Sequence, residues 1–114
     1  MRYALAILLA GAVASPVAAE GPGPRKAVVK QSTWRVDYPS EAVRKEQEGR
    51  VTFVLSIDDT GVVTNCVVTV SSGHPLLDQA ACRTGRNARF EPALDASGAP
   101  VASTLETTSV YDLH

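Results

Sequence analysis

The stretch from Gly49 to Gly73 has the hydrophobic and polar pattern of two β-strands joined by a tight turn. In its first half every second residue is hydrophobic: Val51, Phe53, Leu55 and Ile57. This period is typical of a strand with one buried face. The segment Asp58-Asp59-Thr60-Gly61 follows, where Asp side chains can bond the nearby backbone and Gly61 tolerates a positive φ. The pattern predicts a hairpin whose strands are Arg50–Ile57 and Val62–Val70.

The returning strand of this hairpin is hydrophobic on both faces. Val63 and Val67 fall on one side, and Val62, Cys66, Val68 and Val70 fall on the other. A strand that is covered on both faces is more often central than peripheral in its sheet. We therefore expect Val62–Val70 to be an interior strand with no free backbone to offer a partner.

Two segments have the pattern of helices. A short helix is expected after Pro39, with Gly49 as its end, because Pro is favoured in a first turn. A longer helix is predicted for His74–Ala88, whose apolar side consists of small residues spaced by three and four: Leu77, Ala80, Ala81, Thr84 and Ala88. Such a side allows close packing on a sheet. Gly85 either permits that approach or weakens the last turn.

The C-terminal segment Val101–Leu113 alternates again and is rich in Thr and Ser. This composition is typical of a strand with one solvated face or of an edge strand, and the charge of Glu106 suits an edge. The order of elements is helix–strand–strand–helix–strand. The sequence thus predicts an α+β fold.

The N-terminus has the features of a secretory signal peptide. Arg2 precedes the apolar run Ala4–Ala14, Pro16 interrupts it, and Val17-Ala18-Ala19 predicts cleavage after Ala19. The alternative is an uncleaved inner-membrane anchor, although a spanning helix needs about 20 apolar residues. Residues 20–37 are expected to form a flexible or extended leader. Trp34 within it either packs on the domain, which we favour, or is an exposed contact.

Export to an oxidising compartment decides how the two cysteines are interpreted. Cys66 lies in the second strand and Cys82 in the second helix, and we expect a disulfide between them. The alternative is two separate buried thiols. The sequence has no CxxC pair, and neither His74 nor His114 has metal-ligand spacing to the cysteines, so no metal site is expected.

Several classes of function are disfavoured by what the sequence contains. The formal net charge is −1 at pH 7, without a large basic patch, so nucleic acid is not an expected partner. Ser72, His74 and Asp78 lie close in sequence but lack a nucleophile elbow, and the adjacent Asp58 and Asp59 are explained by the turn. No phosphate-binding loop is present. We expect neither catalysis, nor a cofactor, nor a small-molecule substrate.

The chain from about Tyr38 to Leu113 contains a series of short motifs: Tyr38-Pro39, Ala42, Gly49-Arg50-Val51, Ile57-Asp58, Gly61-Val62, Ser71-Ser72-Gly73, Leu77-Asp78, Ala81, Arg89-Phe90, Pro92-Ala93, Gly98 and Pro100-Val101. In the order and spacing of these motifs the chain resembles the TonB C-terminal domain family. It implies a small antiparallel sheet of about three strands with two helices packed on one face. The domain boundaries are then residues 1–19, 20–37 and 38–114.

The resemblance also implies a function. Domains of this family hold an extended segment of an outer-membrane receptor, the TonB box, by β-strand addition to their last strand. The expected partner-binding edge consists of Ser103, Leu105, Thr107, Thr108, Ser109 and Tyr111. We therefore expect a periplasmic binding module. The alternatives are a membrane-anchored short energy transducer and an accessory envelope protein without a transport role. The short leader departs from the long Pro-rich spacer of a transducing TonB.

Overall fold

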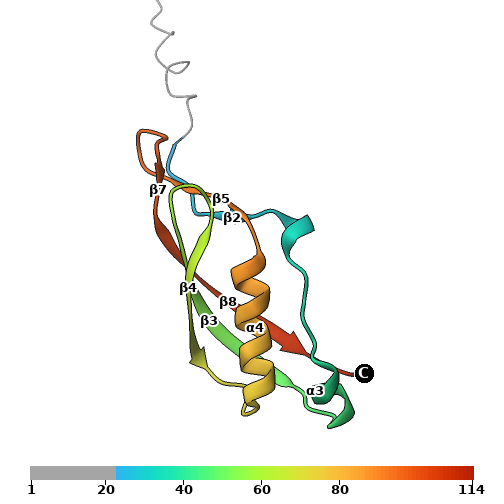
Figure 1. Ribbon diagram of the computed structural model, residues 1–114. Coiled ribbons are helices and arrows are strands. Elements are labelled where there is room, and N and C mark those ends of the chain that lie inside the picture. Colours follow the sequence, from blue (N-terminus) through green and yellow to red (C-terminus); the bar gives the residue numbers. More distant parts are fainter. Residues whose placement is uncertain (1–22) are drawn as a thin grey trace, which may run out of the picture.

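The computed structural model describes residues 23–114. The predicted signal peptide, or alternative anchor, at residues 1–19 lies outside the described residues. The described chain consists of a three-stranded antiparallel sheet with helices on one face and short paired segments at one end (Figure 1). The predicted α+β fold is confirmed.

The sheet has the strand order β4-β3-β8. β3 (Gly49–Ile57) is central and pairs with β4 (Val63–Val70) and with β8 (Ser103–Tyr111), both antiparallel. The period-two hydrophobic positions of β3 are fully buried and form the centre of the core: Val51, Phe53, Leu55 and Ile57. The first strand of the hairpin therefore folds as its pattern predicted, but in the middle of the sheet.

The two α-helices of the described chain lie against one face of the sheet. α3 (Ser40–Arg44) is a single short turn that buries Ala42. α4 (Pro75–Asn87) packs across β3 and β4 with its small residues inward. A Cβ placed on Gly85 would lie 2.7 Å from Cδ2 of Leu55. Gly85 thus permits the close approach of helix and sheet, which was one of its two predicted roles.

The turn between β3 and β4 is fixed by the Asp58 side chain, as the sequence predicted. Its Oδ1 accepts bonds from the amide and hydroxyl of Thr60 and from the amide of Val62. These bonds, that of the Thr60 hydroxyl first, lower the pKa of Asp58. Gly61 has a φ of 89°, and a Cβ there would lie 1.9 Å from the carbonyl oxygen of Phe90. The turn needs glycine for both reasons.

The expectation that Val62–Val70 is an interior strand is wrong, because β4 forms one edge of the sheet. The register with β3 shifts at two places, and the unpaired residues there are Thr64 and Thr69. Each such bulge moves the following residues to the other face. Val63, Cys66 and Val68 consequently share the helix side, whereas Val67 and Val70 are more than half exposed. A strict period of two, without bulges, places these apolar residues on both faces of the strand, and this is why the sequence pattern predicts burial on both faces.

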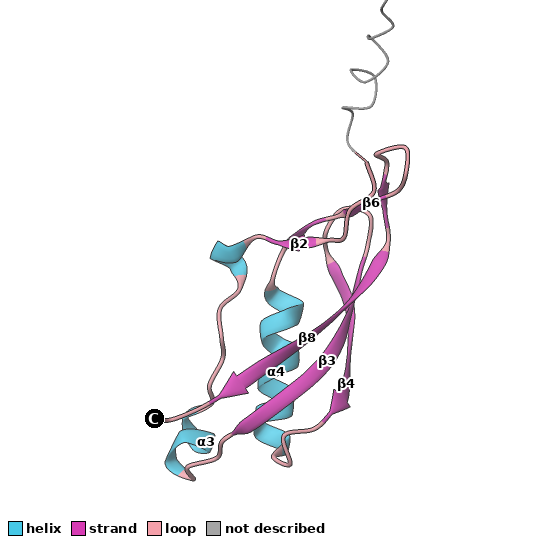
Figure 2. Ribbon diagram, turned by 180° about the vertical axis from the view of Figure 1, so that it is seen from behind, coloured by secondary structure: helices cyan, strands magenta, loops and turns pink. Residues whose placement is uncertain are grey.

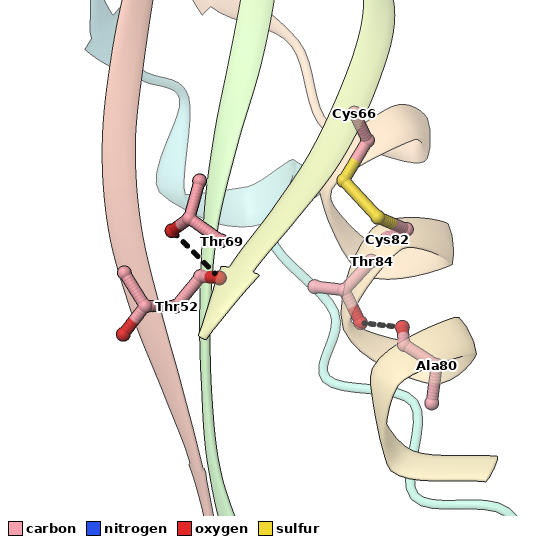
Figure 3. Close-up of a disulfide and its surroundings, with 6 residues drawn as sticks. All are labelled: Thr52, Cys66, Thr69, Ala80, Cys82 and Thr84. Carbon is pink, nitrogen blue, oxygen red and sulfur yellow. Dashed lines mark hydrogen bonds between the residues drawn. A yellow bond between two sulfur atoms is a disulfide. The ribbon is translucent and has the colours of Figure 1, made fainter. Parts of the chain in front are cut away.

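Cys66 and Cys82 form a disulfide, as predicted (Figure 3). Their sulfurs are 2.06 Å apart and their Cα atoms 5.8 Å. Both side chains are buried between β4 and α4. The bridge holds the edge strand to the helix that covers it, and no free cysteine is present.

The chain before α3 packs on the sheet beside α4, and we call residues 25–37 the N-terminal strap. Its strand β2 (Val28–Val29) pairs with β5 (Phe90–Glu91), and its 3₁₀ turn η1 (Gln31–Thr33) follows. Figure 2 shows the strap running from β2 to α3 on the side of β8. This part of the expected leader is held by the domain through the β2–β5 pair. A hairpin of β6 (Ala93–Leu94) and β7 (Pro100–Val101) precedes β8.

Candidate functional site: the outer edge of β8

β8 lies at the edge of the sheet opposite β4 and has one paired neighbour, β3. Its residues alternate as the sequence predicted. Five of the six predicted contact residues face the helices and the strap: Ser103, Leu105, Thr107, Ser109 and Tyr111. The sixth, Thr108, lies on the opposite face, where its hydroxyl is 3.0 Å from that of Thr52. The six predicted residues thus share one strand but not one face.

Two hydrogen bonds between β4 and β3 determine which backbone groups of β8 point toward β3 and which point away from the sheet. The hydroxyls of Thr69 and Thr64, both on β4, donate to the carbonyls of Thr52 (3.2 Å) and Ser56 (3.3 Å); Figure 3 shows the first. These carbonyls therefore point toward β4. Because backbone groups alternate along a strand, those of the intervening Phe53 point toward β8.

Opposed residues in an antiparallel pair alternately exchange both backbone bonds or none. Phe53 is opposite Thr107, so Thr107 is bonded to β3. Thr52 is opposite Thr108, so the amide and carbonyl of Thr108 point away from the sheet. This alternation between paired and outward-pointing backbone groups continues along β8. The outward backbone groups of β8 are those of Thr104, Glu106, Thr108 and Val110.

A groove runs between this edge and the N-terminal strap. One hollow of about 230 Å³ is lined by strap residues, by β8 and by the start of β5. Its residues are Val29, Gln31, Trp34, Phe90, Leu105, Thr107 and Thr108. A second hollow, of about 420 Å³, lies along the N-terminal half of β8 and includes Arg25, Lys26, Ser103 and Glu106. Leu105 contributes to the lining of both hollows.

Trp34 forms the apolar wall of this groove. Its ring is stacked on that of Phe53, with centroids 6.4 Å apart and an interplanar angle of 8°. Thr33 ties the preceding turn to the domain, because its hydroxyl accepts from the Arg89 amide at 2.9 Å. Of its two predicted roles, Trp34 has the favoured one, packing. It is nevertheless only half-buried and also lines the hollow.

The N-terminal end of the groove carries charged side chains of both signs, among them Arg25, Lys26 and Glu106. Glu91 is shared between Arg25 (3.8 Å) and Lys30 (3.6 Å), both exposed pairs. Lys26 is exposed and has no acidic partner within 4.0 Å among the described residues. This end of the groove therefore presents a cationic side chain that is free to meet a carboxylate.

The C-terminal end of β8 is packed into the core by an aromatic contact. The ring of Tyr111 meets that of Tyr38 edge to face at 5.1 Å. Tyr111 and Ser109 are 2% and 8% exposed, and burial is the main cause that raises the pKa of Tyr111. Their side chains anchor the strand in the core and are not available at the surface. The accessible part of the predicted edge is Ser103–Thr108.

Sequence reasoning missed the strap as part of this site. Val29 and Phe90 are distant from β8 in the sequence, and nothing in their local pattern places them beside it. The one available signal was Trp34, a large aromatic residue in a segment otherwise rich in Gly, Pro and polar residues. An aromatic residue in such a segment indicates that the segment packs on something.

Two other groupings of polar side chains occur in the described chain. The Ser72 hydroxyl donates to Asp78 at 2.8 Å and accepts from the His74 amide, so these residues form a helix-start turn. Ligand atoms of Glu48, Asp112 and His114 lie within 4.8 Å of one another at the C-terminal end. The His114 side chain is 85% exposed. No helix in residues 23–114 is long and apolar enough to cross a membrane.

Comparisons with known proteins bear on the family and the fold of this chain. The family model described as Gram-negative bacterial TonB protein C-terminal matches residues 35–113. The solution NMR structure of the Pseudomonas aeruginosa TonB CTD is similar with a TM-score of 0.60 and 23% sequence identity. The similarity covers 78% of this chain and 88% of that one. It shows a shared fold. No curated protein matches the chain in sequence.

Proposed function

Because the chain belongs to the Gram-negative bacterial TonB protein C-terminal family, we propose that it is a periplasmic binding module for an extended segment of an envelope or outer-membrane protein. The segment adds as a strand to the outer edge of β8. The family consists of transport-related binding modules rather than enzymes. A segment of the TonB-box kind, from an outer-membrane receptor, is the partner that family membership favours.

The observation that carries this proposal is the free edge of β8. Four residues direct amides and carbonyls away from the sheet: Thr104, Glu106, Thr108 and Val110. Unpaired backbone groups in a row are a template for another strand. In strand addition the main-chain bonds supply affinity, and alternate side chains supply specificity.

The opposite edge of the sheet is less suited to a partner. β4 carries bulges at Thr64 and Thr69, which interrupt a regular row of backbone groups. It is also held to α4 by the disulfide. β8 pairs with β3 over nine residues without a register shift. Only β8 therefore offers a long regular edge within residues 23–114.

Location in the periplasm is supported by two features. The N-terminal residues have the pattern of a cleavable signal. The Cys66–Cys82 disulfide is of the kind that persists in oxidising compartments. The alternative, an anchored energy transducer, is favoured by the family name alone. Mass spectrometry of the protein from its native cell separates the two, because cleavage leaves Glu20 as the first residue and an anchor keeps residues 1–19.

Hydrogen exchange tests the binding proposal. The probes are synthetic peptides from the periplasm-facing N-terminal segments of outer-membrane receptors of the same cell. We expect a bound peptide to slow exchange at the amides of Thr104, Glu106, Thr108 and Val110. The intervening amides, already bonded to β3, should change little. A peptide that binds without this alternation, or that protects β4 instead, would contradict addition to β8.

A further inference from the structure

We propose that Glu48, Asp112 and His114 bind a zinc ion that joins the segment after β8 to the start of β3. The site shares no residue with the two hollows along the outer edge of β8. It goes beyond the proposed function, which needs no metal. Its two carboxylates and one imidazole are the mixture of oxygen and nitrogen ligands that Zn²⁺ accepts in proteins.

The first step concerns why two carboxylates meet at this end of the sheet. Gly49, the first residue of β3, is opposite Tyr111, the last residue of β8. In an antiparallel pair this register places the preceding Glu48 beside the following Asp112. Figure 1 and Figure 2 show this end of the chain near α3. The meeting results from the pairing of two strands that are distant in the sequence.

The second step concerns the charge of these carboxylates. Like charges directly opposite one another on neighbouring strands destabilise a sheet. Among residues 23–114, neither Glu48 nor Asp112 has a Lys or Arg nitrogen within 4.0 Å, and their contact is with His114. A metal ion between the two carboxylates would remove their repulsion. The strand register therefore creates an arrangement that a cation stabilises.

The third step concerns the distances between the ligand atoms. Nδ1 of His114 lies 3.0 Å from Oε2 of Glu48 and 3.6 Å from Oδ1 of Asp112. Ligands at about 2.0–2.1 Å from a tetrahedral zinc ion are roughly 3.3 Å from one another. All three ligand atoms lie within 4.8 Å of one another. Small side-chain rotations therefore bring them to one ion.

Backbone bonds position the carboxylates, and a hollow leaves room for a further ligand. Oε2 of Glu48 accepts a bond from the Leu113 amide at 3.1 Å. Oδ1 of Asp112 accepts one from the His114 amide at 2.9 Å. The adjoining hollow of about 420 Å³ is lined by Glu46, Glu48, Leu113 and His114. A water molecule there can complete the coordination, as in zinc sites with three protein ligands.

The imidazole determines which ion the site favours. Mg²⁺ and Ca²⁺ are hard cations that prefer a shell of oxygen ligands. An imidazole nitrogen suits Zn²⁺ better. The expectation of no metal site considered the spacing of the histidines to the cysteines, and both cysteines are used in the disulfide. The site proposed here uses carboxylates in place of thiolates.

Calorimetric titration with zinc chloride, on protein without a polyhistidine tag, tests the site. We expect one Zn²⁺ per chain and no comparable binding of Mg²⁺. His114→Ala and Glu48→Gln should each weaken Zn²⁺ binding by more than about tenfold, because loss of an outer-shell partner alone costs that much. Gln keeps an oxygen that can accept from the Leu113 amide. The matched controls His74→Gln and Glu41→Gln should bind Zn²⁺ as the wild type does.

NMR and thermal unfolding locate the bound ion. The chain has two histidines, so the ring signals of His114 can be distinguished from those of His74. Zn²⁺ should shift the His114 signals alone. It should raise the unfolding temperature of the wild type but not of His114→Ala, because an ion that binds the folded state stabilises it. Absence of Zn²⁺ binding, equal affinity for Mg²⁺, or binding that survives both ligand substitutions would overturn the proposal.

Discussion

Thr108 lies directly opposite Thr52 across the β3–β8 pair, with the two hydroxyl oxygens 3.0 Å apart. The carbonyl of Thr52 accepts a bond from β4, on the far side of β3. The backbone of Thr108 is therefore unpaired and points away from the sheet. Its neighbour Thr107 is bonded into the sheet. Adjacent residues of one strand thus differ: the backbone of Thr107 is paired within the sheet, and that of Thr108 lies at the free edge.

This difference predicts opposite results for two proline variants. Thr108→Pro removes an outward amide, so we expect the domain to stay folded and its partner to be lost. Thr107→Pro removes an amide bonded to β3, and we expect a loss of stability of about 3 kcal/mol or more. Circular dichroism and denaturant unfolding measure the fold, and peptide titration measures the partner. Thr108→Val, which keeps the amide and loses the hydroxyl, should still bind; a folded, fully binding Thr108→Pro would disprove the assignment.

The disulfide is expected to make a large contribution to the stability of this small domain. It closes a loop of 16 residues. Loss of such a crosslink typically costs about 3 kcal/mol through the entropy of the unfolded chain. The variant with both Cys66→Ala and Cys82→Ala should lose that much in denaturant unfolding. Reduction of the wild type should shift its unfolding midpoint similarly and leave the double variant unchanged. Equal midpoints for oxidised and reduced wild type would contradict this.

Gly85 and Leu55 lead to a prediction that opposes helix propensity. Gly85→Ala should gain about 1 kcal/mol from propensity. The added Cβ, however, would lie 2.7 Å from Leu55 Cδ2 in a core position with 0% exposure. Overpacking costs about 1–3 kcal/mol, so we expect a net loss of about 1 kcal/mol. Arg86→Ala, on the exposed side of the same turn, should be nearly neutral.

A double-mutant cycle separates this clash from other causes. Leu55→Val shortens the side chain that the new Cβ meets. The combination of Leu55→Val with Gly85→Ala should then cost less than the sum of the two single changes. Additive effects would mean that Gly85 matters for its backbone rather than for its small size.

The parts of the fold that the sequence predicts well are those with an uninterrupted local period. β3 alternates without a break, and α4 places small residues at helical spacing. Their patterns reflect burial directly, so each was predicted with the right boundaries to within a residue or two. The Asp58 turn was predicted for a similar reason, because its chemistry is contained in four consecutive residues.

The errors have a physical cause in each case. The bulges at Thr64 and Thr69 are set by pairing with β3, and a single strand carries no sign of where its partner skips a residue. Because of these bulges, the sequence pattern of β4 resembles that of an interior strand although β4 lies at an edge. The strap is held by contacts of long range, such as those of Trp34 with Phe53. The groove is therefore the part of the candidate site that the local sequence pattern could not predict. The position of β8 at an edge of the sheet, by contrast, was predicted from its sequence.

The last prediction concerns acid stability and the start of α4. Partial burial raises the pKa of Asp78, but bonds from the Ser71 hydroxyl and from the amide and hydroxyl of Ser72 outweigh it, so the pKa is lowered overall. A group with a lowered pKa stabilises the fold above its unfolded pKa, and that stabilisation is lost as the pH falls through the folded pKa. Asp78→Asn should therefore unfold more easily than wild type at pH 7. The difference should shrink below about pH 4, near the pKa of an unperturbed Asp.

Asp59→Asn serves as the control, because the Asp59 carboxylate makes none of these bonds. Urea unfolding at pH 7 and at pH 3 gives the measurement, and a difference between Asp78→Asn and wild type that is the same at both values would contradict the ionic role of Asp78.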